Sequence, residues 1–332
     1  MLKISGHTLM LSLAALLLSL TSCSSDNEKT INEKPVRIDL SCSQIAVDGS
    51  ITTRAGIDEH SVLNGEQVNV YMPQSTITTV MTYTVAAASD ANGKSEMTTS
   101  PIPYLYPSTT PIYGIYPTAA TISADQLSYS VSLDQTTTAN YRLSDLMYAT
   151  SSAARSDANL TTGAISIDLV FHHLMSKVIV EVEGVPSEFE IIGIYLVNVG
   201  KTLSLTPSTY TTISHDDFIG LTTSNVVGSS TNYTQGVKMG TSSGCAALIP
   251  PQTVRGQFIV VEARGVGSKS VHQGIVTYAL SQDETYRLLP GRTYKVKLKM
   301  DTWDFGETLI ISVSDWSNID NPESVGEPRL AV

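Results

Sequence analysis

The sequence predicts an all-β protein made of two antiparallel β-sandwiches in tandem. Short runs recur in which apolar and polar residues alternate, or in which β-branched and aromatic residues are dense. Clusters of Gly, Pro, Asn, Asp or Ser/Thr bound each run. No segment shows a sustained helical periodicity. The 332 residues, 42% of them apolar and 15% charged, suffice for about two domains of ~100–200 residues each.

The charge and cysteine content exclude several classes of protein. Lys and Arg number 20 against 31 Asp and Glu, which gives a net charge of −11. A nucleic-acid partner is not expected, because affinity for nucleic acid comes largely from basic residues that neutralise phosphates. Three cysteines without a CxxC pair are too few for a disulfide scaffold or a cysteine-based zinc site.

The first 22 residues are expected to be a signal peptide. Lys3 precedes the apolar run Leu9–Leu20, which is shorter than the ~20 residues that a membrane span needs. The segment Leu20–Cys23 (LTSC) follows and resembles the lipobox of bacterial lipoproteins, in which the cysteine thiol takes the lipid. We expect Cys23 to carry a fatty-acyl (palmitate) lipid and the precursor to reach the outer membrane. An ordinary signal peptide followed by a chance cysteine is the alternative.

Eleven runs in the remaining chain are predicted to be strands. In order they are Val36–Val47, Gln67–Met72, Thr79–Ala86, Pro111–Tyr116, Ile165–Phe171, Lys177–Val182, Glu190–Val197, Gln257–Arg264, Val271–Leu280, Thr293–Met300 and Thr308–Ser314. The polar stretch Ser151–Gly163 is the expected domain boundary, with one sandwich over residues 55–160 and the other over 161–332. A long loop inside one large sandwich is the alternative interpretation of this stretch.

Residues capable of catalysis or metal binding are few. The sequence has no GxSxG, GxxxxGK[ST], HExxH or GxGxxG motif. His172 and His173 are adjacent, so a strand would place them on opposite faces, which favours one packed and one exposed histidine over a metal site. The loop His215-Asp216-Asp217 offers too few oxygen ligands for calcium, and Asp283-Glu284 is typical of a solvated turn. No enzyme activity, metal or cofactor is expected.

A group of tyrosines leaves two interpretations open. Tyr104, Tyr106, Tyr113 and Tyr116 could form an aromatic platform for sugars. Because prolines interleave with them, they equally fit a core in which only the hydroxyl groups reach the surface, and we favour the core.

A series of short motifs in one order resembles the fimbrillin family of Bacteroidales, the type V pilins and their relatives. The motifs are Cys23, Thr52–Ala55 (TTRA), Pro111–Pro117 (PIYGIYP), Asp145–Ala149 (DLMYA), Phe171–Val180 (FHHLMSKVIV), Leu248–Gln252 (LIPPQ), Leu289–Val296 (LPGRTYKV) and Ile311–Trp316 (ISVSDW). The series spans nearly the whole chain. The resemblance implies two transthyretin-like β-sandwiches in tandem and export as a lipoprotein.

In the polymerising members of that family, a trypsin-like protease cuts after an arginine. Carried over to this chain, the cut falls between Arg54 and Ala55, and residues 23–54 become a lipidated pro-segment. The resemblance also implies that the neighbouring subunit supplies a replacement strand from its C-terminal region. Thr308–Val313 and Ser324–Val332 are the two candidates, although Pro328 limits the second as a strand.

The pro-segment contains a pattern that fits a removable strand. Val36, Ile38, Leu40 and Cys42 alternate with polar residues, as in a strand with one buried face. Its removal would expose an unpaired sheet edge, which another chain can pair with. A disulfide from Cys42 to Cys245 would tether this strand, so we expect both cysteines to be free and buried.

The sequence therefore predicts a structural subunit of a cell-surface fimbria, in a stalk or tip position, that assembles by protease-triggered strand exchange and contributes to adhesion. Its expected partners are other fimbrial subunits, bound through strand addition, and the outer membrane, bound through the lipid. The sequence leaves open whether the protein also binds a receptor on a host or bacterial surface. The alternative function is a non-polymerising surface lipoprotein that binds glycans.

Overall fold

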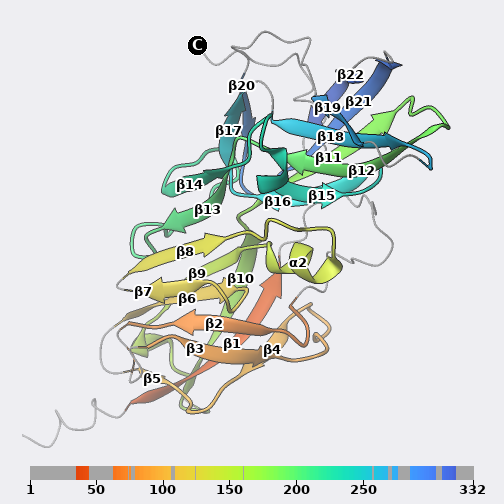
Figure 1. Cartoon of the computed structure of the whole chain (residues 1–332). Coiled ribbons are helices and arrows are strands. Elements are labelled where there is room, and N and C mark those ends of the chain that lie inside the picture. The colour runs from red at the N-terminus through yellow and green to blue at the C-terminus, as the bar shows by residue number, and fades with distance from the viewer. Residues whose placement is uncertain are drawn as a thin grey trace, which may run out of the picture.

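The computed structural model describes residues 35–44, 63–73, 75, 79–105, 109–123, 125–159, 161–255, 258–267, 271–275, 285–303 and 309–318. These residues form an elongated, nearly all-β molecule in which two β units are stacked end to end (Figure 1). The described part has one α-helix, α2 (Thr138–Leu143). The prediction of an all-β fold is confirmed.

The first unit is a sheet whose strand order closes on itself. Its strands are β1 (Val36–Gln44), β2 (Gln67–Tyr71), β3 (Met81–Val85), β4 (Ser95–Thr98), β5 (Tyr104–Leu105), β6 (Thr110–Tyr116), β9 (Met147–Ala153) and β10 (Ala164–His173). The order is β10-β9-β6-β2-β3-β4-β1-β5, and β10 also pairs with β1. The long strand β10 thus contacts β9 at its end and β1 along most of its length, and β1 completes the ring.

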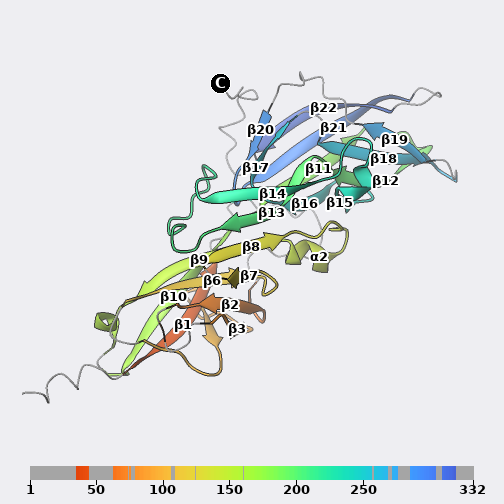
Figure 2. The same ribbon diagram turned by 60° about the vertical axis from the view of Figure 1, so that its left-hand side comes forward.

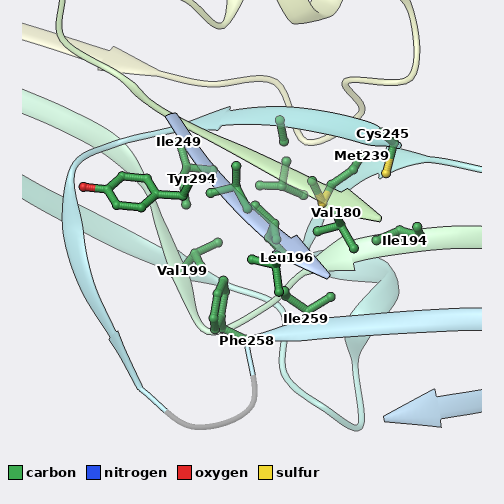
Figure 3. Packing of buried hydrophobic residues seen from close by; sticks show 14 of the residues in the cluster. Val180, Ile194, Leu196, Val199, Met239, Cys245, Ile249, Phe258, Ile259 and Tyr294 are labelled. Carbon is green, nitrogen blue, oxygen red and sulfur yellow. The ribbon is translucent and has the colours of Figure 1, made fainter. Parts of the chain in front are cut away.

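The second unit is a sandwich of two four-stranded sheets. One sheet has the order β16-β11-β21-β22 and the other β15-β12-β18-β19. The strands are β11 (Ser176–Glu183), β12 (Phe189–Leu196), β15 (Val237–Gly240), β16 (Cys245–Ile249), β18 (Ile259–Gly265), β19 (Val271–Ile275), β21 (Thr293–Trp303) and β22 (Leu309–Asn318). Aliphatic side chains from both sheets, such as Val180, Leu196 and Ile259, pack together between them (Figure 3). The short strands β17 (Gln252–Arg255) and β20 (Thr285–Leu288) pair beside this sandwich.

A further four-stranded sheet joins the two units. Its order is β14-β13-β8-β7, in which β7 (Thr121–Ser123) and β8 (Gln126–Ser130) come from the first half of the chain. The other two strands, β13 (Val199–Leu205) and β14 (Leu221–Val227), come from the second half (Figure 2). A hydrophobic cluster that includes Tyr148, Leu203 and Leu248 packs where the units meet. The two units are therefore in direct contact.

Two details of the predicted architecture are wrong. The boundary does not lie at residue 160, because β10 belongs to the first unit; the chain passes into the second unit at Leu174 and Met175. The pairing is also not purely antiparallel, since β1 pairs with β10 and β11 with β21 in parallel. Both parallel pairs join strands far apart in the sequence, where no hairpin imposes an antiparallel direction.

Candidate functional site

The candidate site is the position of β1 within the first sheet. Along one side, β1 pairs in parallel with β10 over eight positions, from Arg37 opposite Ala164 to Gln44 opposite Phe171. Along the other side it pairs antiparallel with β4 and, near its start, with β5. The Ile38 amide also donates to the Pro103 carbonyl, with N and O 3.2 Å apart. β1 is thus an interior strand with hydrogen-bonded neighbours on both sides.

One face of β1 fills the core of the first unit, as the alternation of its residues predicts. Ile38, Leu40 and Cys42 are 2%, 4% and 3% exposed, and Val36 is half-buried against the same cluster. Met97 of β4 and Leu169 of β10 belong to this cluster. The side chains of β1 therefore occupy an apolar row between these two strands.

The opposite face of β1 carries polar contacts. The Asp168 carboxylate on β10 accepts hydrogen bonds from Ser41 Oγ and Ser43 Oγ, each at 3.0 Å. Lys94 Nζ lies 3.2 Å from Asp168 Oδ2. Nearer the start of the strand, Arg37 and Asp39 form an exposed ion pair at 2.7 Å. Pairing, burial and these polar contacts together hold β1 in the sheet.

The two described cysteines, Cys42 and Cys245, are buried and are not joined to each other by a disulfide. They belong to different hydrophobic clusters, Cys42 in the first unit and Cys245 in the second. Burial, together with the nearby Asp168 carboxylate, raises the pKa of the Cys42 thiol to about 12. Because the thiolate is the reactive form, Cys42 is a poor nucleophile while β1 is in place.

Several residues predicted from the sequence lie outside the described residues. These are the lipidation residue Cys23, the processing residues Arg54 and Ala55, and Tyr106, Asp283 and Glu284. The structure therefore places the predicted exchangeable strand but not the cut that would release it.

His172 and His173, which the sequence predicts to point to opposite faces of a strand, have different partners at the junction of the units. His173 Nδ1 lies 2.7 Å from Asp145 Oδ2, whereas His172 Nδ1 lies 3.3 Å from His215 Nε2. His215 Nδ1 in turn donates to the Pro290 carbonyl at 2.9 Å, so its Nε2 accepts a hydrogen bond from His172 Nδ1 when both rings are neutral. Both histidines of the pair 172–173 are half-buried, so the expected contrast of one packed and one exposed ring is wrong.

Of the two acidic residues next to His215, Asp216 forms an ion pair and Asp217 accepts a hydrogen bond from the Ile219 amide at 3.1 Å. Asp216 Oδ1 lies 3.0 Å from Arg292 Nη2, and Arg292 Nε donates to the His215 carbonyl at 3.3 Å. Within the ranges described above, no group of three or more His, Cys, Asp or Glu side chains is arranged to hold a metal ion. These contacts join the loop between β13 and β14 to the turn before β21, and they account for the polar residues His215 and Asp216 in that loop.

The tyrosines belong mainly to the interior. Tyr113 and Tyr116 are each 3% exposed, while Tyr104 is 38% exposed. The Tyr113 ring lies between those of Tyr71 and Tyr148, with centroids 6.1 and 6.3 Å away. Tyr113 and Tyr116 therefore pack in the core and are not available as an exposed aromatic platform for glycans.

The sequence did not point to Asp168 or to β10 as neighbours of β1. Asp168 is separated from Ser41 by 127 residues, and neither residue belongs to a catalytic or binding motif. The one available signal was the alternation in Ile165–Phe171, which predicts a strand but not its partner. The parallel pairing becomes visible only in the folded chain.

Comparisons with known proteins identify the family to which this chain is similar. The family model described as fimbrillin-like matches residues 53–316. No curated protein sequence gives a significant match. Among residues that the structure describes, no helix is long and apolar enough to cross a bilayer.

Several solved structures are similar to this chain at low sequence identity. A candidate cell adhesion protein of Bacteroides uniformis is 12% identical, with a TM-score of 0.50 over 86% of this chain and 98% of that one. A candidate cell adhesion protein of Bacteroides ovatus is 11% identical, with a TM-score of 0.49 over 86% and 98%. The tip fimbrial protein Mfa3 of Porphyromonas gingivalis is 9% identical, with a TM-score of 0.42 over 86% and 99%.

The family match covers most of the chain and includes β2 through most of β22. It supports a role as a fimbrial subunit at the cell surface that interacts with other subunits, in a family of structural proteins and not of enzymes. On this evidence the chain belongs to the fimbrillin-like family.

Proposed function

We propose that this chain is a stalk or tip subunit of a fimbria that assembles by strand exchange. In this proposal, lipid on Cys23 anchors the precursor to the outer membrane, and a protease cuts between Arg54 and Ala55. β1 then leaves the first unit, and a strand of a neighbouring subunit takes its place. The observation that carries the proposal is the position of β1 between β10 and β4, upstream of the cut.

Chain connectivity explains why a cut would matter. β1 is followed in the sequence by Arg54, and its described neighbours β10 and β4 are bound to it by hydrogen bonds and packing. Before a cut, β1 rebinds as part of the same molecule at a high effective concentration. After a cut, rebinding is bimolecular, so a strand from another subunit can compete for the same place.

The vacated place would be suited to a new strand. β10 and β4 would each lose a hydrogen-bonded neighbour, and the core would lose the side chains of Ile38, Leu40 and Cys42. Each aliphatic side chain buried there contributes about 1.5–3 kcal/mol, and an unpaired edge readily accepts another strand. The subunit would thus bind its neighbour through backbone pairing and an apolar row together.

The thiol of Cys42 offers a direct test of strand release. The full chain is treated briefly with trypsin under native conditions, cleavage after Arg54 is verified by mass spectrometry, and iodoacetamide labelling is mapped to each cysteine. We expect cleavage to make Cys42 reactive while Cys245, buried in the second unit, stays protected. SDS-resistant ladders should appear in the same samples.

The matched control is Arg54→Ala, which removes the trypsin site without touching a described contact. This variant should keep Cys42 protected and form no ladders. Continued protection of Cys42 after verified cleavage, or ladders from the uncut variant, would contradict release of β1 as the assembly step.

A further inference from the structure

The polar face of β1 contains one contact that depends on side-chain identity and not only on backbone pairing. Asp168 lies directly opposite Ser41 in the parallel register of β10 and β1. Its two carboxylate oxygens accept separate hydrogen bonds, Oδ1 from Ser41 and Oδ2 from Ser43. Its side chain is only 22% exposed, and Lys94 Nζ lies 3.2 Å from its Oδ2. Asp168 therefore holds two hydroxyl groups of one strand at the same time.

This arrangement distinguishes the observed register from its alternatives. A strand must slip by two residues to keep the same residues facing the core. A slip in one direction would bring the Asp39 carboxylate opposite Asp168, where the two negative charges repel. A slip in the other direction would put Ser43 opposite Asp168 and bring Ile45, which has no hydroxyl group, to the position of Ser43. Only the observed register gives both carboxylate oxygens a donor.

We propose that Asp168 selects the strand that enters the groove vacated by β1. The site takes an extended segment with the order aliphatic, Ser/Thr, small apolar, Ser/Thr, in which both hydroxyl groups face Asp168. It rejects a segment with an acidic residue at either of those positions. This inference rests on the proposed strand exchange and names the partner strand that the exchange accepts.

A second copy of this chain carries a segment with that order. Ile38-Asp39-Leu40-Ser41-Cys42-Ser43 in β1 corresponds, position by position, to Leu309-Ile310-Ile311-Ser312-Val313-Ser314 in β22. Among the strands that the structure describes, β22 is the last in the order of its sheet and pairs there with β21. The other candidate, Ser324–Val332 (SVGEPRLAV), lacks the two spaced hydroxyl groups and contains Glu327 and Pro328. The geometry therefore favours β22 over the tail as the donor.

Peptide binding to the full chain, cleaved after Arg54 and freed of its pro-segment, tests this selection. Three fluorescent peptides are compared by anisotropy under reducing conditions: Pro35–Gln44, Leu309–Trp316 and Ser324–Val332. We expect the first two to bind and the third to bind at least about tenfold more weakly. In each binding peptide, replacing either serine by alanine removes a hydrogen bond to a carboxylate and should weaken binding about tenfold.

Introducing a negative charge into the peptide tests the selection more stringently than removing a hydroxyl group. Ser312→Asp in the β22 peptide should weaken binding by more than about tenfold, because its carboxylate would face Asp168. In the protein variant Asp168→Asn, which keeps the shape of the side chain, that loss should shrink to within about threefold. Asp39→Ala in the β1 peptide is the matched control, since Asp39 is also on the outer face but contacts Arg37. Its effect should stay within about threefold.

The outcomes separate this inference from the proposed function. If β1 leaves after cleavage and all peptides bind equally, or if Ser312→Asp binds as well as the parent peptide, selection by Asp168 is wrong while strand exchange stands. If β1 stays bound and Cys42 stays protected after verified cleavage, both are wrong. Should Asp168→Asn fold poorly, the peptide series with the unaltered protein gives the same decision.

Discussion

A single glycine in the middle of β6, Gly114, makes room for side chains of β10, the strand that pairs with β1. A Cβ atom placed on Gly114 would lie 2.7 Å from the tip of the Phe171 ring and 3.2 Å from Leu169 Cδ1. Both of these residues are fully buried in β10, the strand that pairs with β1. Glycine normally weakens a strand, and here its lack of a side chain makes room for an aromatic ring.

We predict that Gly114→Ala destabilises the protein by about 1–3 kcal/mol, because an extra methyl group overpacks a core that has no room to relax. Urea unfolding followed by circular dichroism measures the change.

A double-mutant cycle with Phe171→Leu provides the control for this prediction. In the Phe171→Leu background the ring is absent, so the added cost of Gly114→Ala should fall to less than about half. An equal cost in both backgrounds would place the effect of the alanine elsewhere than at the Phe171 ring.

At the scale of elements, the sequence predicts strands better than it predicts their partners. Each of the eleven predicted runs overlaps an observed strand, because alternation in runs such as Val36–Val47 reports one buried and one exposed face. Many other strands are not among these runs. One is β16, whose five residues Cys245–Ile249 are buried on both faces and show no alternation, and another is β8, which is short although it alternates. The six-residue helix α2 is too short to give a helical period.

The candidate site shows the same limit. The burial of Ile38, Leu40 and Cys42 follows from local alternation. The parallel neighbour β10 does not, because the paired residues are more than 120 positions apart and no turn signal joins them. Asp168 could be recognised as a partner of Ser41 only once that register was known.

We expect the contact between the end of β10 and the β13–β14 loop to make the protein less stable in acid. Burial, with smaller contributions from His215 and His173, lowers the pKa of His172 from 6.5 to about 4. Between these two values the unfolded chain binds more protons than the folded one, so stability falls as the pH drops from 6.5 towards 4.

We predict that His172→Asn, which cannot titrate, reduces this loss by about 1–2 kcal/mol after allowance for solvent screening of a half-buried ring. Urea unfolding at pH 7.5, 6.5, 5.5 and 4.5 tests it. The variant and the original protein should differ in the slope of stability against pH below 6.5 and not above it. Parallel slopes over the whole range would exclude His172 as the source.

At the scale of the whole molecule, backbone pairing joins the two units. Domains that are connected only by a flexible linker lack such pairing. β8 of the first half pairs with β13 of the second from Leu127 opposite Leu205 to Ser130 opposite Thr202. The segment after β8 continues the contact, since the Gln135 amide donates to the Lys238 carbonyl at 2.9 Å. The paired strands and this hydrogen bond hold the two units directly against each other.

Gln135 adds a fully buried side-chain contact to this joint. It is fully buried, its Nε2 donates to the Leu248 carbonyl at 2.8 Å, and its Oε1 accepts from the Leu248 amide at 2.9 Å. The side chain thus pairs with β16 of the second unit as another strand would. Its loss would leave both backbone groups of Leu248 buried without these partners.

We therefore predict that Gln135→Ala destabilises the protein by about 2–4 kcal/mol, the cost of two buried polar groups left unpaired. It should also weaken the coupling of the units, so that a single unfolding transition broadens or separates into two when circular dichroism and tyrosine fluorescence are compared. Gln126→Ala, which removes an exposed glutamine from β8, is the matched control and should change stability by less than about 0.5 kcal/mol. If the two variants were equally stable and both unfolded in one transition, Gln135 would not be what holds the units together, and the paired strands β8 and β13 would carry the joint alone.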